Sequence, residues 1–178
     1  SSPVQIPGTQ WSSISAGGGT QSLATKIDGT LWAFGLNNSG QLGQNNRIYY
    51  SSPVQIPGTS WSSISGGNTF SAATKTDGTL WSWGYNVFGE LGQNNRTQYS
   101  SPVQIPGTQW SSVTVGVTNM LATKTDGTLW AWGYNNNGRL GQNNVTSYSS
   151  PVQIPGTQWS SVSSTYHTLA TKTDGTLW

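Results

Sequence analysis

The sequence predicts an all-β protein built from the blades of a β-propeller, and three observations support this. The phrase SPVQIPGT starts at Ser2, Ser52, Ser101 and Ser150, which gives spacings of 50, 49 and 49 residues. Each unit holds short runs of Thr, Leu and aromatic residues between Gly, Pro and Asn, a pattern typical of strands and turns, and no window has helical periodicity. Units of about 40 to 50 residues are typical of propeller blades, whereas solenoid coils take about 20 to 30.

The whole chain is therefore interpreted as a single repeat array, residues 1–178, with no linker or second domain. It contains about 3.6 repeats of 49–50 residues, each expected to form a blade of antiparallel strands. The predicted repeats are 1–50, 51–99, 100–148 and a truncated fourth, 149–178.

The elements of the first unit illustrate the others. PVQIPG, residues 3–8, has proline at both ends, which suits an edge strand because a missing N–H donor does little harm there. WSSIS, residues 11–15, predicts a further short strand. LATKIDGTLWAFG, residues 23–35, predicts a hairpin with a two-residue type I′ turn at Asp28-Gly29. GLNNSGQLGQNN, residues 35–46, predicts a long polar loop with tight glycine turns.

These motifs carry a family resemblance. WSS[IV]S followed by a glycine-rich turn, and LATKTDGTLWAWGYNNNGRLGQ at 121–142, resemble the repeat of the regulator of chromosome condensation family along the entire chain. The resemblance implies a seven-bladed propeller, of which this chain would supply about half. It does not carry over the exchange activity of the eukaryotic member, because the sequence has no counterpart of the acidic contact loops.

The last unit stops after TKTDGTLW, where the earlier copies continue with AFG, SWG or AWG. Three explanations are open: a window on a longer protein, two chains sharing one ring, or successive chains pairing end to end in a filament. The first is preferred because a natural boundary would rarely cut a strand after its third residue.

Composition narrows the function. Only 7% of residues are charged and the net charge of +2 is spread along the chain, which argues against nucleic acid, since that partner needs clustered Lys and Arg. No apolar run approaches the roughly 20 residues that span a bilayer, so no membrane insertion is expected. A charge-poor surface rich in amides and hydroxyls favours an extracellular, cell-surface or virion protein.

Groups for catalysis are scarce, so the chain is not expected to be an enzyme. His167 is the single histidine and is interpreted as a structural, hydrogen-bonded residue. The four Asp residues occupy identical turns, and Glu90 is expected to be a solvated loop residue. Calcium needs several carboxylates and zinc needs Cys or His clusters, so no metal and no cofactor are predicted.

Tryptophan is abundant and recurs at fixed places. Packing between blades is favoured over aromatic platforms for sugars or peptides, because residues i and i+2 of a strand face the same side. On this interpretation Trp81→Ala costs about 3 to 5 kcal/mol. The recurring tryptophans are Trp11, Trp61, Trp110, Trp159, Trp32, Trp81, Trp130, Trp178, Trp83 and Trp132.

Three segments differ between units: one before the hairpin, one after it, and one before the next SSPVQIPG. A constant scaffold with changing loops is how repeat proteins build interaction surfaces, although drift in unimportant loops is an equal alternative. Candidate interaction residues in these segments are Gln21, Phe70, Asn119, His167, Phe88, Glu90, Arg139 and Tyr49. Sequons make Asn37, Asn95 and Asn144 possible glycosylation sites.

The leading hypothesis is a non-catalytic propeller module that acts as a structural or macromolecular-interaction scaffold. The alternative is a glycan- or protein-binding module that uses the variable loops, as a lectin or an inhibitor does. The expected partners are a protein, a glycan, or other copies of the chain.

Overall fold

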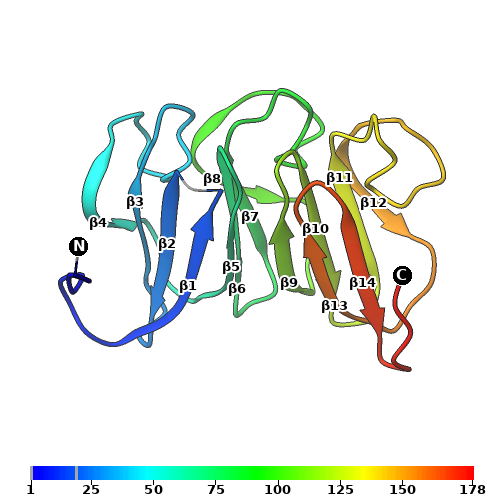
Figure 1. Ribbon diagram of the computed structural model, residues 1–178, viewed down its shortest axis with the longest axis horizontal. Coiled ribbons are helices and arrows are strands. Elements are labelled where there is room, and N and C mark those ends of the chain that lie inside the picture. Colours follow the sequence, from blue (N-terminus) through cyan, green and yellow to red (C-terminus); the bar gives the residue numbers. More distant parts are fainter. Residues whose placement is uncertain (1, 19) are drawn as a thin grey trace.

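The computed structural model describes residues 2–18 and 20–178, and in this part of the chain all the regular structure is β-strand. Four antiparallel sheets lie side by side along the long axis of the molecule (Figure 1). Three sheets have four strands each, in the orders β1-β2-β3-β4, β5-β6-β7-β8 and β9-β10-β11-β12, and the fourth has two, β13-β14. The prediction of propeller blades is confirmed.

The blades have strands of nearly equal length. Blade 1 comprises β1 (Trp11–Gly17), β2 (Gln21–Lys26), β3 (Leu31–Gly35) and β4 (Tyr50–Ile56). Blade 2 comprises β5 (Trp61–Gly66), β6 (Phe70–Lys75), β7 (Leu80–Gly84) and β8 (Tyr99–Ile105). Blade 3 comprises β9 (Trp110–Val115), β10 (Asn119–Lys124), β11 (Leu129–Gly133) and β12 (Tyr148–Ile154). The last sheet comprises β13 (Trp159–Ser164) and β14 (Thr168–Lys172), and an isolated bridge joins Thr171 to Leu177.

The outer strand of each blade comes from the following sequence repeat. β4, β8 and β12 contain the PVQI phrase and occupy the edge of their sheets, where proline was expected. The sequence repeat and the structural blade are thus offset, so that each repeat after the first begins by completing the blade before it.

The hairpin turns differ from the predicted two-residue type I′ loop. In blade 1, the N–H of Gly29 donates to the carbonyl of Lys26, and Lys26 N–H donates to the Thr30 carbonyl, which gives a three-residue loop. Only Gly29 has a positive φ there, at 77°. Asp28 stays in the ordinary region because its carboxylate accepts bonds from the Thr30 N–H and hydroxyl, at 3.0 and 2.7 Å.

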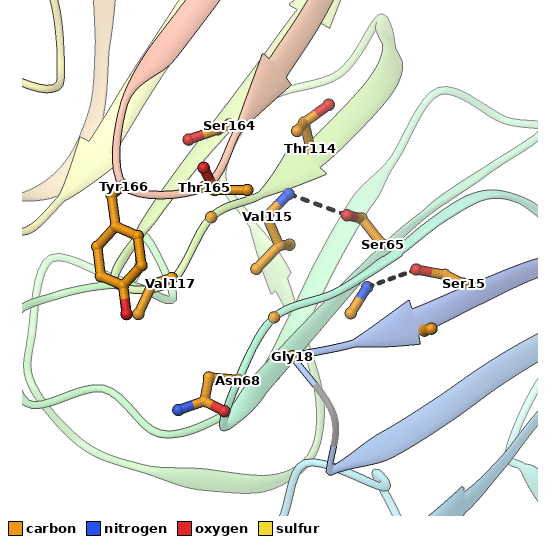
Figure 2. Close-up of a pocket in the computed structure, with 14 residues that line it drawn as sticks. Ser15, Gly18, Ser65, Asn68, Thr114, Val115, Val117, Ser164, Thr165 and Tyr166 are labelled. Carbon is orange, nitrogen blue, oxygen red and sulfur yellow. Dashed lines mark hydrogen bonds between the residues drawn. The ribbon is translucent and has the colours of Figure 1, made fainter.

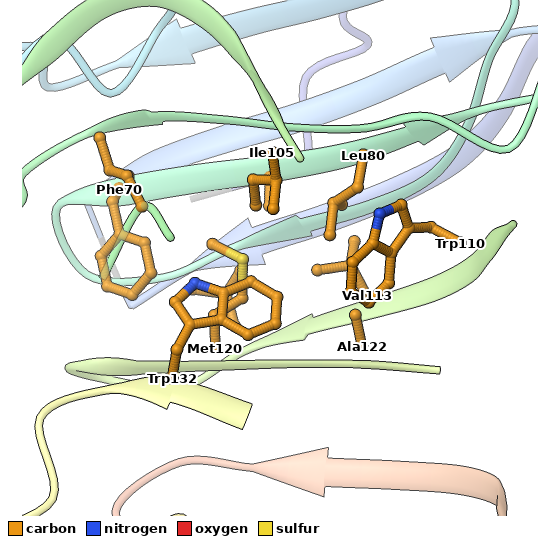
Figure 3. Packing of buried hydrophobic residues seen from close by; sticks show 11 residues of the cluster. Phe70, Leu80, Ile105, Trp110, Val113, Met120, Ala122 and Trp132 are labelled. Atoms are coloured by element: carbon orange, nitrogen blue, oxygen red, sulfur yellow. The ribbon is translucent and has the colours of Figure 1, made fainter. Parts of the chain in front are cut away.

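The core lies between blades, where each contributes large side chains to the wedge. Trp83 of blade 2 packs against Leu23, Leu31 and Ile56 of blade 1. Trp132 of blade 3 packs in the same way among Phe70, Leu80 and Ile105 of blade 2 (Figure 3). Both indoles are fully buried, and their N–H groups donate to the backbone carbonyls of Gln41 and Glu90, at 2.8 and 2.9 Å.

Packing between blades is thus confirmed for Trp83 and Trp132, but Trp81 and its equivalents have another environment. Trp81 is only half-buried, and its indole lies edge-on to Trp61 with the ammonium of Lys75 4.8 Å from the ring centroid. The expected cost of Trp81→Ala falls accordingly, since half-exposed side chains lose less contact on truncation than buried ones.

A buried asparagine holds each long polar loop. Asn86 has no exposed surface; its amide donates to the carbonyls of Asn95 and Thr97, and its side-chain oxygen accepts from the N–H of Leu91. Asn37 and Asn135 make the equivalent bonds in their own loops.

Loss of this asparagine should loosen the loop. We expect Asn86→Ala to lower the free energy of unfolding by about 1 to 3 kcal/mol, because it leaves buried backbone groups without partners. The exposed Asn136→Ala, in the next loop, is the control and should change it by less than about 0.5 kcal/mol. Urea denaturation curves compare the two variants, and equal midpoints would contradict this role.

Candidate functional site

The three variable segments of each repeat lie on one face of the array. In an antiparallel blade the connections from first to second strand and from third to fourth leave the sheet at the same end, and Figure 1 shows these loops at the top. We call this the variable-loop face. The hairpin turns and the PGT turns lie at the opposite end, where Gly29 contacts Ser60 and its carbonyl accepts from Trp61 N–H. The sequence differences between units therefore accumulate on a single surface.

A groove of about 530 Å³, with no charged side chain among its lining residues, runs along the inner edge of the blades. It is lined by the ends of β1, β5, β9 and β13 and by the turns that follow them (Figure 2). Serine hydroxyls tie adjacent first strands together here, since the N–H of Gly66 donates to Ser15 and that of Val115 donates to Ser65, at 3.0 and 2.9 Å. The wall is thus a continuous surface shared by all four units.

The variable residues that reach this groove are Asn68, Val117 and Tyr166 (Figure 2). Tyr166 is 63% exposed. The sequence prediction missed all three, although they belong to the variable segments and stand just before the residues that were chosen. Asn68 and Val117 lie in the turns, whereas Phe70 and Asn119 are the first residues of β6 and β10, so the boundary between turn and strand separates the two sets.

The residues chosen in those segments do not form an exposed surface. Gln21, Phe70 and Asn119 are buried, so these three candidate residues do not have the exposed position that a partner contact requires. Each pairs with the glycine that ends the third strand of its blade, and its side chain turns toward the neighbouring blade. Gln21 donates to the Gly67 carbonyl at 2.9 Å, and Asn119 donates to the Ser164 hydroxyl at 3.1 Å.

His167 is the fourth member of that set and differs from the others. It is exposed, although a hydrogen-bonded structural role was expected. It lines a pocket of about 240 Å³ together with Arg139, Trp159 and Trp178.

The candidate residues Phe88 and Arg139 both contact the ring of Tyr134. Phe88 packs on Tyr134 with ring centroids 4.5 Å apart, and the guanidinium of Arg139 lies 5.2 Å from the same Tyr134 ring. Arg139 also donates to the Thr118 hydroxyl at 2.9 Å. Loops of blades 2 and 3 thus form one half-exposed aromatic and cationic cluster. Tyr49, which is 60% exposed, lies on the corresponding loop of blade 1.

Glu90 was expected to be solvated, and this is wrong. The side chain has no exposed surface, because the loop 86–92 folds back on itself and seats it against blade 3. One carboxylate oxygen accepts from the Phe88 N–H at 2.8 Å, and the other has no donor among the described residues. Burial raises the pKa of Glu90 from 4.5 to about 7. Gln41 in blade 1 and Arg139 in blade 3 occupy the position of Glu90.

The glycosylation candidates have different environments. Asn37 is fully buried and its amide donates to Asn46 and Ile48, so the structure contradicts a glycan there. Asn95 and Asn144 lie nearer the surface, where their amides donate to the tyrosine hydroxyls of Tyr99 and Tyr148. Those two sites stay predictions.

The remaining acids are committed to turns. The carboxylate of Asp77 accepts from the N–H and the hydroxyl of Thr79, and these bonds hold the pKa of Asp77 below its ordinary value. The other three turn aspartates have the same bonds and the same direction of pKa shift. Within residues 2–18 and 20–178 there is no group of three acids or histidines that could hold a metal, and no helix there is long and apolar enough to cross a membrane.

Four-stranded antiparallel sheets in a row, with a shared inner groove and loops on one face, define an array of β-propeller blades. The chain belongs to the regulator of chromosome condensation (RCC1) repeat family, whose repeat model matches residues 28–74, 77–122 and 126–170. A second model of the same repeat matches residues 61–90 and 110–139.

Solved structures with the same fold include human WBSCR16, with a TM-score of 0.84 and 22% identity over 98% of this chain and 48% of that one. Prp20p from Saccharomyces cerevisiae has a TM-score of 0.79 and 19% identity over 89% of this chain and 42% of that one. Yeast RCC1 (Prp20) bound to Kap60 has a TM-score of 0.75 and 21% identity over 94% and 42%. The chain spans a little under half the length of these proteins, and no curated protein matches it.

Proposed function

We propose that this chain is a non-catalytic propeller scaffold that binds a macromolecular partner through its variable-loop face. One observation carries the proposal: the three variable segments of the near-identical repeats lie on that face, and the segments between the first and second strands of all four units meet along the inner groove. A rigid scaffold with variable loops is the usual basis of recognition in repeat proteins. The turn aspartates are bound by threonines and Glu90 is buried, so neither offers a base to a substrate.

The chemistry of the groove favours a neutral, polar partner segment. Serine, threonine and glycine line it, with Asn68 as an amide and Tyr166 as an exposed aromatic ring, and no charged side chain is among its lining residues. Exposed tyrosines are common anchors of protein interfaces, because the ring is apolar and the hydroxyl can bond. Protein is therefore the favoured partner. In line with this, the Prp20p structures are described with binding to Gsp1p and histones and to Kap60, which are properties of that protein.

The charge-poor surface supports an extracellular, cell-surface or virion setting for this scaffold. A structural role, in which identical units make identical lateral contacts, is the second candidate and is supported by the near-identity of the strands. Negative-stain images at micromolar concentration separate the two roles, since regular filaments or particles are expected only for the structural one.

The binding proposal is tested with substitutions on the two faces. We expect Tyr166→Ser combined with Asn68→Ala to weaken binding to a protein-array partner at least about tenfold, as loss of a central interface anchor does. Ile27→Ser is the matched control, because Ile27 is 75% exposed in the hairpin turn at the opposite end of the blade. Equal affinity of both variants, with unchanged circular dichroism, would refute the variable-loop face as the binding surface.

A further inference from the structure

A repeated cationic and aromatic site lies where the first strand of each unit begins and the second strand ends, at the end of the blades that carries the hairpin turns. In blade 3 the ammonium of Lys124 lies 4.7 Å from the Trp110 ring centroid and 4.9 Å from that of Trp130. The same arrangement recurs in every unit, and we call it the Lys–Trp clamp. Its members are Lys26 with Trp11 and Trp32, Lys75 with Trp61 and Trp81, Lys124 with Trp110 and Trp130, and Lys172 with Trp159 and Trp178.

Each clamp contains a hydrogen-bond donor that the described residues leave unsatisfied. The indole nitrogens of Trp11, Trp61, Trp110 and Trp159 are all buried without an acceptor. Trp61, Trp110 and Trp159 are 4%, 3% and 7% exposed. A buried N–H without an acceptor costs about 1 to 3 kcal/mol, so its recurrence at one position of the repeat calls for an explanation beyond packing.

The two donors of a clamp converge on one point. In blade 3 a Cβ on Gly107 would lie 3.7 Å from Nζ of Lys124 and 3.8 Å from Nε1 of Trp110. In blade 2 the corresponding distances from Gly58 are 3.4 Å to Lys75 and 3.7 Å to Trp61. Gly107 has a φ of 96°, a conformation that suits glycine, so the point beside the two donors carries no side chain.

The nearest acid in sequence does not neutralise the ammonium. The Asp126 carboxylate accepts from the N–H and the hydroxyl of Thr128, at 3.0 and 2.7 Å, within its own turn. An ammonium and an indole N–H that face one point form a receptor for a carboxylate, since both can donate to its oxygens.

Blade 3 also provides a groove in front of the clamp. A pocket of about 330 Å³ is lined by Trp110, Lys124, Trp130, Pro106, Pro151 and Asn94. Its walls combine indole and proline surfaces, which suit the C–H face of a sugar ring, with polar groups at the edge. Asn94 comes from blade 2, so the groove lies at the junction of two blades.

A peptide is the less suitable occupant. Peptides commonly bind beside a sheet by extending its edge strand, and this requires free backbone N–H groups. The edge strands β4, β8 and β12 carry Pro53, Pro102 and Pro151, which have no N–H to donate. An acidic sugar needs only the carboxylate receptor and the flat walls.

We propose that each Lys–Trp clamp binds the carboxylate of a uronic acid, so that the hairpin-turn end of the array holds an acidic polysaccharide at one site per blade. The clamps repeat once per blade, and several weak sites on one polymer add to a higher overall affinity. The clamp residues are the same in every unit and lie outside the variable segments, so this site is distinct from the partner binding proposed above.

The test uses calorimetric titration of the 178-residue chain with tetragalacturonic acid and with its methyl ester. We expect the ester to bind at least about tenfold more weakly, because it has no carboxylate to pair with the lysine ammonium. The ester keeps the same sugar rings, so the comparison isolates the charge. This comparison needs no variant, so it holds whether or not a substitution perturbs folding. Equal binding of acid and ester, or no binding of the acid, would overturn the proposal.

Variants then locate the site. Lys75→Met with Lys124→Met keeps the aliphatic stems over the indoles and should weaken binding of the acid at least about tenfold. Arg47→Met with Arg96→Met removes the same charge outside the clamps and should leave binding within about twofold.

Trp110→Phe retains a ring without the N–H and should weaken binding at that clamp. Equal loss in both double variants would show general charge attraction, and tighter binding of tetraglutamate would show an acidic peptide site; either result would refute the sugar site.

Discussion

Trp132→Ala is expected to destabilise the chain more than any other single truncation, by about 3 to 5 kcal/mol, as for fully buried aromatic residues elsewhere. The indole fills the wedge between blades 2 and 3, in contact with Phe70 and Ile105 (Figure 3). Its N–H also satisfies the carbonyl of Glu90 at 2.9 Å. The substitution therefore opens a cavity at a junction between blades and leaves a buried acceptor without a partner.

Because each blade contacts mainly its neighbours, the substitution should weaken the contact between blades 2 and 3 more than the contacts within either blade. Urea denaturation followed by far-ultraviolet circular dichroism measures the loss, since tryptophan fluorescence itself changes with the variant. Phe34→Ala is the matched control: Phe34 occupies the equivalent place in blade 1, where it is only half-buried, and its loss should cost less than about 1.5 kcal/mol. If the two variants unfold at the same urea concentration, Trp132 does not have this packing role.

The architecture could be predicted from the sequence because its signals are repeated. The strands, the edge position of PVQI and the packing of tryptophans between blades each appear several times in the sequence, and one physical argument applies to every copy. The turn at Asp28-Gly29 was located correctly but given the wrong geometry. The bonds from Asp28 to Thr30 decide its form, and a dipeptide rule does not include that threonine.

The candidate site was less predictable because it depends on single positions within short segments. Asn68 reaches the inner groove, whereas Phe70, two residues later, is at the start of β6 and faces blade 3. The sequence shows that both residues vary between units but does not show where the turn ends and the strand begins. Glu90 was misjudged for a similar reason, since a charged residue in a polar loop is usually exposed.

Glu90 should make the stability of the chain depend on pH in a range where no other acid titrates. Its pKa is about 7 in the folded chain and 4.5 ordinarily, so the folded state binds the proton more tightly. Below pH 4.5 both states are protonated and the carboxyl has no effect. As the pH rises from 4.5 to about 7 the unfolded state ionises first and the free energy of unfolding falls, in total by roughly 3 kcal/mol. The turn aspartates act at lower pH, because their pKa values lie below 3.8.

The repeat provides a reciprocal pair of variants for this effect. Gln41 occupies the position of Glu90 in blade 1, where its side-chain oxygen accepts from the Ser39 N–H at 2.9 Å, as Glu90 accepts from Phe88. Glu90→Gln should therefore keep the loop bond, remove the pH dependence between 4.5 and 8, and raise stability at pH 8 by roughly 1 to 3 kcal/mol, since no charge is buried. Gln41→Glu should introduce the same pH dependence into blade 1. Urea denaturation at several pH values measures both, and a Glu90→Gln curve parallel to the unmodified chain would mean that Glu90 ionises as freely in the folded chain as in the unfolded one.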